Sequence, residues 1–277
     1  MVNTVLKQKS NKSYRIQTGW LGSVFWVVFG MTVVFVIAVF VALLWFGLKE
    51  PLIKLFNNPE IRFAVGFTLK TTFMATMGAT LTAIPCGYLL ARRNFPGKVV
   101  VDILLDLPIM LPPLVSGVAL LIMFGPILGT GLERFGLRIV FSPLGVIVAQ
   151  WFIALPLVIK MFRESFESID PRLENVARTL GCTWDMAFFR VTLPMAGRGI
   201  FAGMAMAWAR TIGEFGATAM LAGVTRMKTE TLSAAVYLNM SIGEIQVALG
   251  ISVLMFLTAI TILLLFKIWV GYGIKNE

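Results

Sequence analysis

The sequence contains no histidine and two cysteines, Cys86 and Cys182. Because these residue types supply the ligands of most zinc, haem and iron–sulfur centres, their scarcity excludes a His- or Cys-rich metal site and a disulfide scaffold. We expect both thiols to stay reduced and separate. The sequence also lacks a Gly-x-x-x-x-Gly-Lys-Ser/Thr phosphate loop, so we do not expect the chain itself to be an ATP-hydrolysing enzyme.

Charge is scarce as well. Of 277 residues, 14% are charged and 58% hydrophobic, and the mean hydropathy is +0.86. This composition is typical of an all-α integral membrane protein. A bilayer-crossing helix needs roughly 20 mostly apolar residues. Six segments have about this length and composition, although Arg210 and Glu214 interrupt the fifth. The six predicted transmembrane helices cover residues 21–48, 71–91, 107–132, 139–159, 199–223 and 247–266.

The basic residues indicate the orientation of these spans. The N-terminal segment and every second loop after it, with the C-terminus, hold fifteen Lys and Arg, against seven in the alternate loops. The positive-inside rule therefore predicts that both termini are cytoplasmic in a multi-pass protein of the cell membrane. The net charge of +10 is then explained by loops beside anionic lipid, without a nucleic-acid partner. The predicted organisation is a cytoplasmic segment, 1–20, followed by a membrane domain, 21–277.

Prolines crowd the third predicted span at Pro108, Pro112 and Pro113. They interrupt helical hydrogen bonding, which is tolerated at membrane depth where protein or a water-filled cavity surrounds the backbone. Two interpretations stay open: a span in the interior of the bundle that lines a pathway, or a kink that serves packing.

One polar segment, residues 162–194, separates the fourth and fifth predicted spans. Asp170 and Pro171 form a helix start, and Gly181 a stop. Thr183 and Asp185 begin a second short helix. The first helix carries apolar residues at Leu173, Val176, Ala177 and Leu180, and the second at Trp184, Ala187, Phe188 and Val191.

These two amphipathic helices have two possible roles, docking of another protein or burial against lipid. In either case the sequence predicts that their charged side chains point outward; these are Arg172, Glu174, Arg178 and Asp185.

A spacing pattern in this segment resembles a known family. Asn175-Val176-Ala177, three residues, Gly181, nine residues and Val191-Thr192-Leu193-Pro194 resemble the Glu-Ala-Ala signature of ABC-importer permease subunits. The chain departs from it at Asn175 and Val176, and Glu174 stands one residue before the position of the family's Glu. The resemblance implies a coupling helix that contacts an ATP-binding subunit. The residues implied in this contact are Arg172, Glu174, Asn175, Ala177, Arg178 and Gly181.

A second stretch, residues 209–223, contains Gly213-Glu214-Phe215-Gly216-Ala217 and is similar to a segment of sulfate, molybdate and tungstate permeases, most of all the molybdate/tungstate branch. The resemblance implies a homodimer that imports a tetrahedral oxyanion by alternating access. It also implies two cytoplasmic ATP-binding subunits, which carry ATP and Mg, and an extracellular or periplasmic oxyanion-binding protein. A sulfate/thiosulfate permease is the alternative within the same family.

Arg210 and Glu214 are four residues apart, so they share a helical face and can neutralise each other. Charges at membrane depth face the bundle interior or a pathway. The pair either attracts an oxyanion through Arg210 or fixes packing as a structural ion pair. Thr211 and Thr218 equally suit a weakly polar pathway or close helix packing.

Other classes fit the sequence less well. An ion-coupled secondary transporter usually shows internal repeats and unpaired intramembrane carboxylates or histidines, which we do not find. A membrane enzyme would need a nucleophile and a base at depth.

Overall fold

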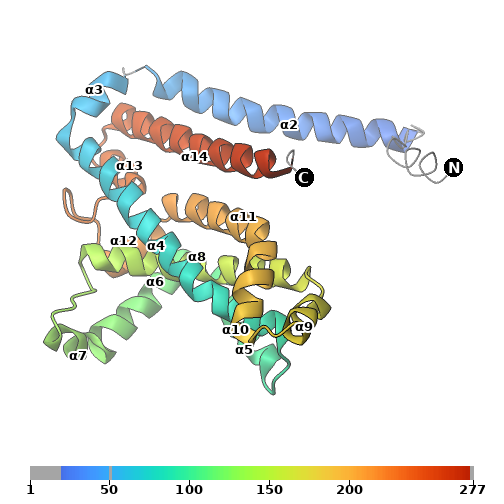
Figure 1. Ribbon diagram of the computed structural model, residues 1–277. Helices are drawn as coiled ribbons and strands as arrows, with labels where there is room; N and C mark the ends of the chain where they lie inside the picture. Colours follow the sequence, from blue (N-terminus) through green and yellow to red (C-terminus); the bar gives the residue numbers. More distant parts are fainter. Residues whose placement is uncertain (1–19, 50–51, 275–277) are drawn as a thin grey trace. The chain divides into compact units, whose positions relative to one another are not determined.

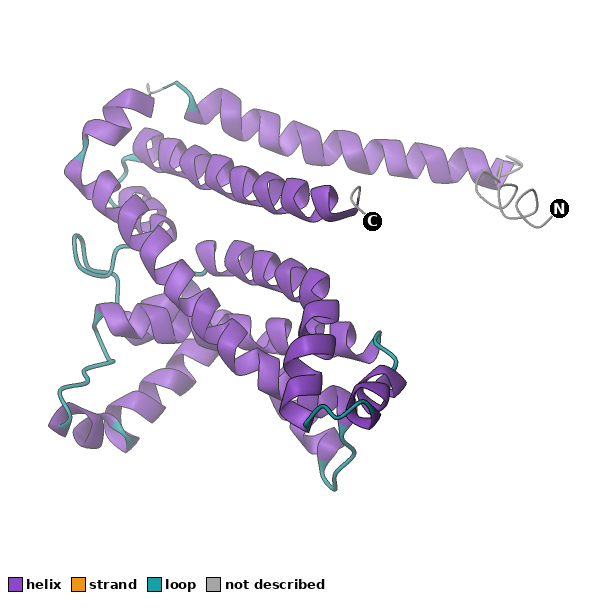
Figure 2. Ribbon diagram, viewed as in Figure 1, coloured by secondary structure: helices purple, strands orange, loops and turns teal. Residues whose placement is uncertain are grey.

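The computed structural model describes residues 20–49 and 52–274, and every regular element in these ranges is helical (Figure 2). The all-α prediction is confirmed for this part of the chain. Contacts divide the chain into two compact units, Met1–Phe46 and Gly47–Glu277, which are described separately. Most of the predicted cytoplasmic segment, 1–20, lies outside the described residues.

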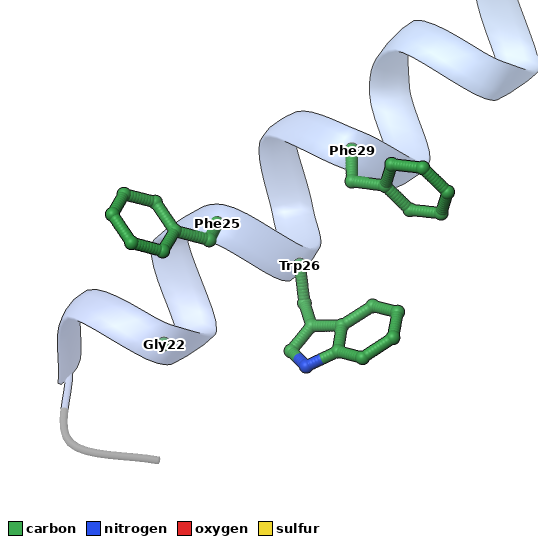
Figure 3. Close-up of a pocket in the computed structure, with 4 residues that line it drawn as sticks. All are labelled: Gly22, Phe25, Trp26 and Phe29. Atoms are coloured by element: carbon green, nitrogen blue, oxygen red, sulfur yellow. The ribbon is translucent and has the colours of Figure 1, made fainter. Parts of the chain in front are cut away.

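The first unit contains all but the last residue of helix α2, Trp20–Gly47. Helix α2 has 28 residues and no charged side chain. At 1.5 Å per residue its length is roughly 42 Å, which exceeds the thickness of a bilayer core. A shallow hollow on α2 is lined by Gly22, Phe25, Trp26 and Phe29. Figure 3 shows that these four residues come from adjacent turns of one helix. No second described element lines the hollow, so it is a surface feature of one helix.

The second unit is built from long apolar helices joined by short ones (Figure 1). Its α-helices are α3 (Leu52–Asn57), α4 (Pro59–Arg92), α5 (Lys98–Met110), α6 (Pro113–Ile122), α7 (Gly129–Arg134), α8 (Pro143–Glu167), α9 (Pro171–Thr179), α10 (Trp184–Ala187), α11 (Leu193–Ile212), α12 (Gly216–Ala222), α13 (Leu232–Ser241) and α14 (Ile245–Ile274). Two π-helical turns, η1 (Met123–Ile127) and η2 (Phe188–Thr192), continue α6 and α10.

Helices α4 and α8 form the centre of this unit. Side chains cap both at the N-terminus: Asn58 accepts the Glu60 N–H before α4, and Ser142 accepts the Gly145 N–H before α8. A proline occupies the first turn of each helix, where its missing N–H costs no hydrogen bond. The two starts are therefore fixed by local sequence.

Small side chains let α4 and α8 approach each other closely. Ala79 and Ala83 of α4 share a buried cluster with Ala154 and Val158 of α8. A β-carbon on Gly87 of α4 would lie 3.0 Å from Cβ of a buried aromatic residue of α8. Membrane helices lack a hydrophobic force between them, so such tight packing supplies much of their association.

The structure supports four spans by length and apolar composition, or five with one bent pair. The four are α2, α4, α8 and the Ile245–Leu264 part of α14. Helix α5 and the segment Pro113–Ile127 are together long and apolar enough for one further span. The chain bends by 114° between them, at the predicted proline break. The predicted number of six spans is thus not confirmed, because residues 199–223 are not one helix. Helix α11 ends at Ile212 and α12 begins at Gly216.

The third predicted span lies only partly in the bundle interior. Residues 107–110 of this span lie in helix α5, which buries none of its residues within the chain. Helix α6 does bury one face, comprising Ser116, Gly117 and Leu120. The break at Leu111 and Pro112 separates the two environments, since α5 lies before it and α6 after it.

Candidate functional site

The polar segment between α8 and α11 folds as its sequence predicts. The Asp170 carboxylate accepts the Arg172 N–H at 2.9 Å, and Pro171 opens α9. Gly181 has φ +93°, a conformation that favours glycine, and ends the turn after α9. The hydroxyl of Thr183 then caps α10 by accepting the Met186 N–H at 3.3 Å. Both predicted short helices are confirmed.

The apolar side of α9 is open to the surroundings. Leu173, Val176 and Leu180 are exposed, Leu180 to 81%, while the small Ala177 is buried. The helical spacing of these apolar residues therefore does not indicate a face that packs against the rest of this chain. An exposed apolar strip beside charged residues is typical of a surface that another molecule covers.

Glu174 corrects one prediction, because its side chain points inward rather than outward. It is 13% exposed, and Oε1 accepts the Arg92 Nε–H at 3.0 Å. Its other oxygen, Oε2, accepts the Tyr88 hydroxyl at 2.8 Å. A carboxylate with a cationic and a hydroxyl donor no longer needs water to satisfy it. The exposed positions of Arg172, Arg178 and Asp185 agree with the prediction.

Tyr88 and Arg92 attach the short helices to the end of α4. The Tyr88 ring lies edge-on to Phe166, Trp184 and Phe188, with centroid distances of 5.6, 5.8 and 4.8 Å. Arg92 also donates from Nη2 to the Ile169 carbonyl at 3.0 Å. The sequence analysis missed both residues. The one feature of the sequence that could have indicated them is their i, i+4 spacing. It places a tyrosine and an arginine on one face at the end of an apolar helix.

Part of α9 and the turn that follows it line a surface hollow of about 430 Å³. Of the predicted coupling residues, Asn175 and Arg178 line this hollow and Arg172 is exposed. Ala177 is buried, and Gly181 forms the turn after α9. We call this hollow the α9–α10 hollow. Its lining consists of Asn175, Arg178, Thr179, Cys182, Thr183 and Trp184.

The second candidate site is the break between α11 and α12. Arg210 Nη1 lies 2.9 Å from Glu214 Oε2, so the predicted ion pair is present; the two side chains are 40% and 1% exposed. The other carboxylate oxygen of Glu214 accepts the Ala217 N–H at 2.9 Å. Glu214 therefore both neutralises Arg210 and starts α12, which explains why the helix breaks here.

The two threonines of this predicted site are buried. Thr211 donates to the Trp208 carbonyl at 2.9 Å, and Thr218 donates to the Phe215 carbonyl at 2.8 Å. Of the four predicted pathway residues, Arg210 has the one exposed side chain within the chain. The structure thus brings the four residues to one break, with only the guanidinium accessible.

This break packs against the proline break of the third predicted span. A β-carbon on Gly216 would lie 3.0 Å from Cβ of Pro113, and one on Gly117 would lie 2.8 Å from Cα of Ala217. Glycine is required at such approaches because any side chain displaces the neighbouring backbone. The two interrupted spans therefore meet at their interruptions.

A third polar cluster lies in the loop between α12 and α13. Arg226 forms an ion pair with Glu60 at the start of α4. Glu230 is 1% exposed, and its Oε2 accepts the Met227 N–H at 3.1 Å. Burial raises the pKa of Glu230; the Met227 N–H opposes this rise, Glu60 adds to it, and Arg226 opposes it.

These features define a class of protein: a multi-pass helical membrane protein with a structured polar segment at one end. A family profile described as binding-protein-dependent transport system inner membrane component matches residues 83–272. The chain belongs to this family. It is therefore a membrane component of an ABC transport system, and its relatives are permease subunits rather than enzymes.

Curated relatives belong to oxyanion transport systems. The chain is 31% identical over 217 residues to the sulfate transport system permease protein CysT of Escherichia coli, with 78% of each chain covered. It is 37% identical over 184 residues to the molybdenum transport system permease protein ModB of the same organism, covering 65% of this chain and 80% of that one. Identity to the molybdate/tungstate permease WtpB of Thermococcus kodakarensis is 38% over 173 residues, covering 62% and 66%.

Solved structures show the same fold. A bacterial alginate ABC transporter in complex with a periplasmic protein aligns with a TM-score of 0.71 at 16% identity, covering 89% of this chain and 92% of that one. The MetNI methionine ABC transporter in an inward-facing conformation aligns with a TM-score of 0.61 at 20% identity, covering 81% and 99%.

Proposed function

We propose that two copies of this chain form the membrane pathway of an ATP-driven importer for a tetrahedral oxyanion. The observation that carries this proposal is the similarity to sulfate, molybdenum and molybdate/tungstate permeases alike. Their substrates share one chemistry, a tetrahedral dianion. Higher identity to the molybdate branch favours molybdate or tungstate, and sulfate or thiosulfate is the alternative.

The membrane pathway is assigned to the meeting of the two interrupted spans. Arg210 supplies one accessible positive charge there, and its Glu214 partner limits the strength of anion binding. Weak binding suits transport, because a strongly bound anion would not leave the site. Thr211 and Thr218 border the same break, so a change of conformation that opens it would bring their hydroxyls close to the anion. Alternating access requires such a change.

The α9–α10 hollow and the apolar strip of α9 are assigned to contact with a cytoplasmic ATP-binding subunit. Arg172 and Arg178 provide charge at this surface, and Leu173 and Val176 provide apolar area. ATP and Mg are bound by that subunit, and both termini of this chain lie on the same cytoplasmic side. An oxyanion-binding protein delivers the substrate from the opposite side.

ATP hydrolysis in lipid tests this assignment. The chain is reconstituted with its ATP-binding subunit and with binding protein loaded with molybdate, tungstate or sulfate. Reversal of charge on α9, Arg172→Glu with Arg178→Glu, is expected to abolish the stimulation of ATPase activity by loaded binding protein. Arg190→Glu, an exposed change outside the hollow, is the control and is expected to keep it. Equal stimulation in all three proteins would contradict the coupling role, and anion uptake without an ATP-binding subunit would favour a secondary transporter.

A further inference from the structure

A cavity of about 250 Å³ lies between α4, α5 and α8. It is distinct from the α9–α10 hollow and from the α11–α12 break, because its lining residues come from neither. Four of these residues carry charge, Asp102 and Asp106 from α5 and Lys160 and Arg163 from α8. Leu90 and Leu105 are among its apolar walls. The cavity therefore presents both signs of charge and no net charge.

Two of the four charges are already paired. Arg163 Nη1 lies 3.0 Å from Asp102 Oδ1, and its Nε lies 2.7 Å from Glu167 Oε1. Lys160 and Asp106, in contrast, have no hydrogen-bond or ion-pair partner among residues 20–49 and 52–274. The cavity thus holds one ammonium and one carboxylate that are both available to a ligand.

The cavity lies at the boundary between the apolar spans and the polar segment. Its α8 residues, Pro156 to Arg163, lie in the second half of that helix, which leads into the segment that forms α9. Helix α5 buries none of its residues and exposes an apolar surface. The exposed members of this surface include Val99, Val100, Ile103, Leu104 and Leu107.

We propose that this cavity binds the headgroup of an ethanolamine phospholipid. The phosphate is placed at Lys160, with Arg163 beside it, and the primary ammonium is placed at Asp106, with Asp102 beside it. The acyl chains follow the apolar surface of α5. Charge-assisted hydrogen bonds to both ends of one zwitterion satisfy the two unpaired groups at once.

Charge complementarity separates this ligand from others. A transported dianion would lie close to two carboxylates, and a divalent cation would lie close to two basic side chains, so each meets repulsion. An anionic lipid such as phosphatidylglycerol can bind Lys160 but leaves Asp106 unpaired. Phosphatidylcholine carries a quaternary ammonium with no N–H, so it cannot donate a hydrogen bond to Asp106. The pattern of charges therefore favours a primary-amine zwitterion.

Native mass spectrometry of the assembled transporter tests the proposal. The complex is stripped of lipid in detergent and then titrated separately with phosphatidylethanolamine, phosphatidylglycerol and phosphatidylcholine. We expect retention of the ethanolamine lipid to exceed that of the other two by about tenfold, the effect of one charge-assisted hydrogen bond. This comparison of lipids uses only the unaltered protein, so its result does not depend on whether a variant folds. Equal retention of the three lipids would overturn the proposal.

Paired substitutions locate the site. Lys160→Gln with Asp106→Asn is expected to remove the preference for the ethanolamine lipid. The control, Arg190→Gln with Glu164→Gln, makes the same charge changes at exposed positions outside the cavity and is expected to preserve it. A preference that survives the first pair would place the lipid elsewhere. Soluble phosphoethanolamine is added in a separate arm, and displacement of the lipid at equal concentration would show a free metabolite site instead.

Discussion

The hydroxyl of Tyr88 donates to Glu174 Oε2 at 2.8 Å, across 86 positions of sequence. This hydrogen bond joins the end of the central helix α4 to the helix that carries the family signature. Arg92, one turn after Tyr88, closes a second bond to the same carboxylate. A part-buried polar connection and aromatic packing therefore both attach this segment to α4.

Removal of the Glu174 carboxylate should loosen this connection. Glu174→Ala leaves the Arg92 guanidinium and the Tyr88 hydroxyl without their partner, at a cost of about 1–3 kcal/mol. We expect a lower unfolding temperature and weaker stimulation of the ATPase by loaded binding protein. Asp185→Ala removes an exposed carboxylate of the same segment and serves as the control. Normal stimulation in the Glu174 variant would show that α9 acts without this connection.

Close packing between α6 and α12 gives a second prediction. Gly117→Ala places a β-carbon 2.7 Å from Cβ of Met220, which should destabilise the protein by about 1–3 kcal/mol. Gly197→Ala in α11 meets no atom within 4 Å, so it should be neutral or stabilise by about 0.5–1 kcal/mol. Thermal unfolding in detergent compares the two. Equal unfolding temperatures would mean that α6 and α12 do not pack as described.

Local signals predicted several elements of this fold correctly. The caps at Asp170 and Thr183, the turn at Gly181 and the break before Pro113 each depend on a few neighbouring residues. Side-chain caps and restricted backbone angles act over such short distances, so sequence alone reveals them.

Long-range partners could not be predicted in the same way. Glu174 points inward because Tyr88 and Arg92 lie beside it in space, and nothing near Glu174 in the sequence indicates them. The α11–α12 break likewise depends on the second carboxylate oxygen of Glu214, which accepts the Ala217 N–H. The sequence predicted one span over residues 199–223, interrupted by two charged residues. The hydrogen bond of one buried carboxylate instead divides the segment into two helices.

Glu230 gives a prediction on pH. Because burial raises its pKa in the folded state, the folded chain holds this proton more tightly than the unfolded chain. Stability from Glu230 is therefore present at low pH and lost as pH rises through the folded pKa. Glu230→Gln, whose amide oxygen still accepts the Met227 N–H, should raise the unfolding temperature above neutral pH and have little effect at low pH. The exposed Glu244→Gln is the control, and an effect of Glu230→Gln that does not change with pH would contradict this.

The Arg210–Glu214 pair can be tested without leaving an unpaired charge. The double variant Arg210→Gln with Glu214→Gln removes both partners, whereas Arg210→Gln alone would leave the buried Glu214 without its cationic partner. If Arg210 meets the anion, uptake should fall by about tenfold, the value of one charge-assisted bond. Removing the other ion pair, by Arg226→Gln with Glu60→Gln, should leave uptake unchanged. Normal uptake in the first double variant would assign a purely structural role to the pair.

Uptake of labelled oxyanion by reconstituted vesicles tests the central claim most directly. Vesicles contain this chain with its ATP-binding subunit, enclose ATP on the side of α9, and receive binding protein with labelled molybdate or labelled sulfate outside. The account predicts accumulation that requires ATP, binding protein and this chain together, with molybdate taken up faster than sulfate. Accumulation driven by an ion gradient in the absence of ATP, or no accumulation of any tetrahedral oxyanion, would contradict it.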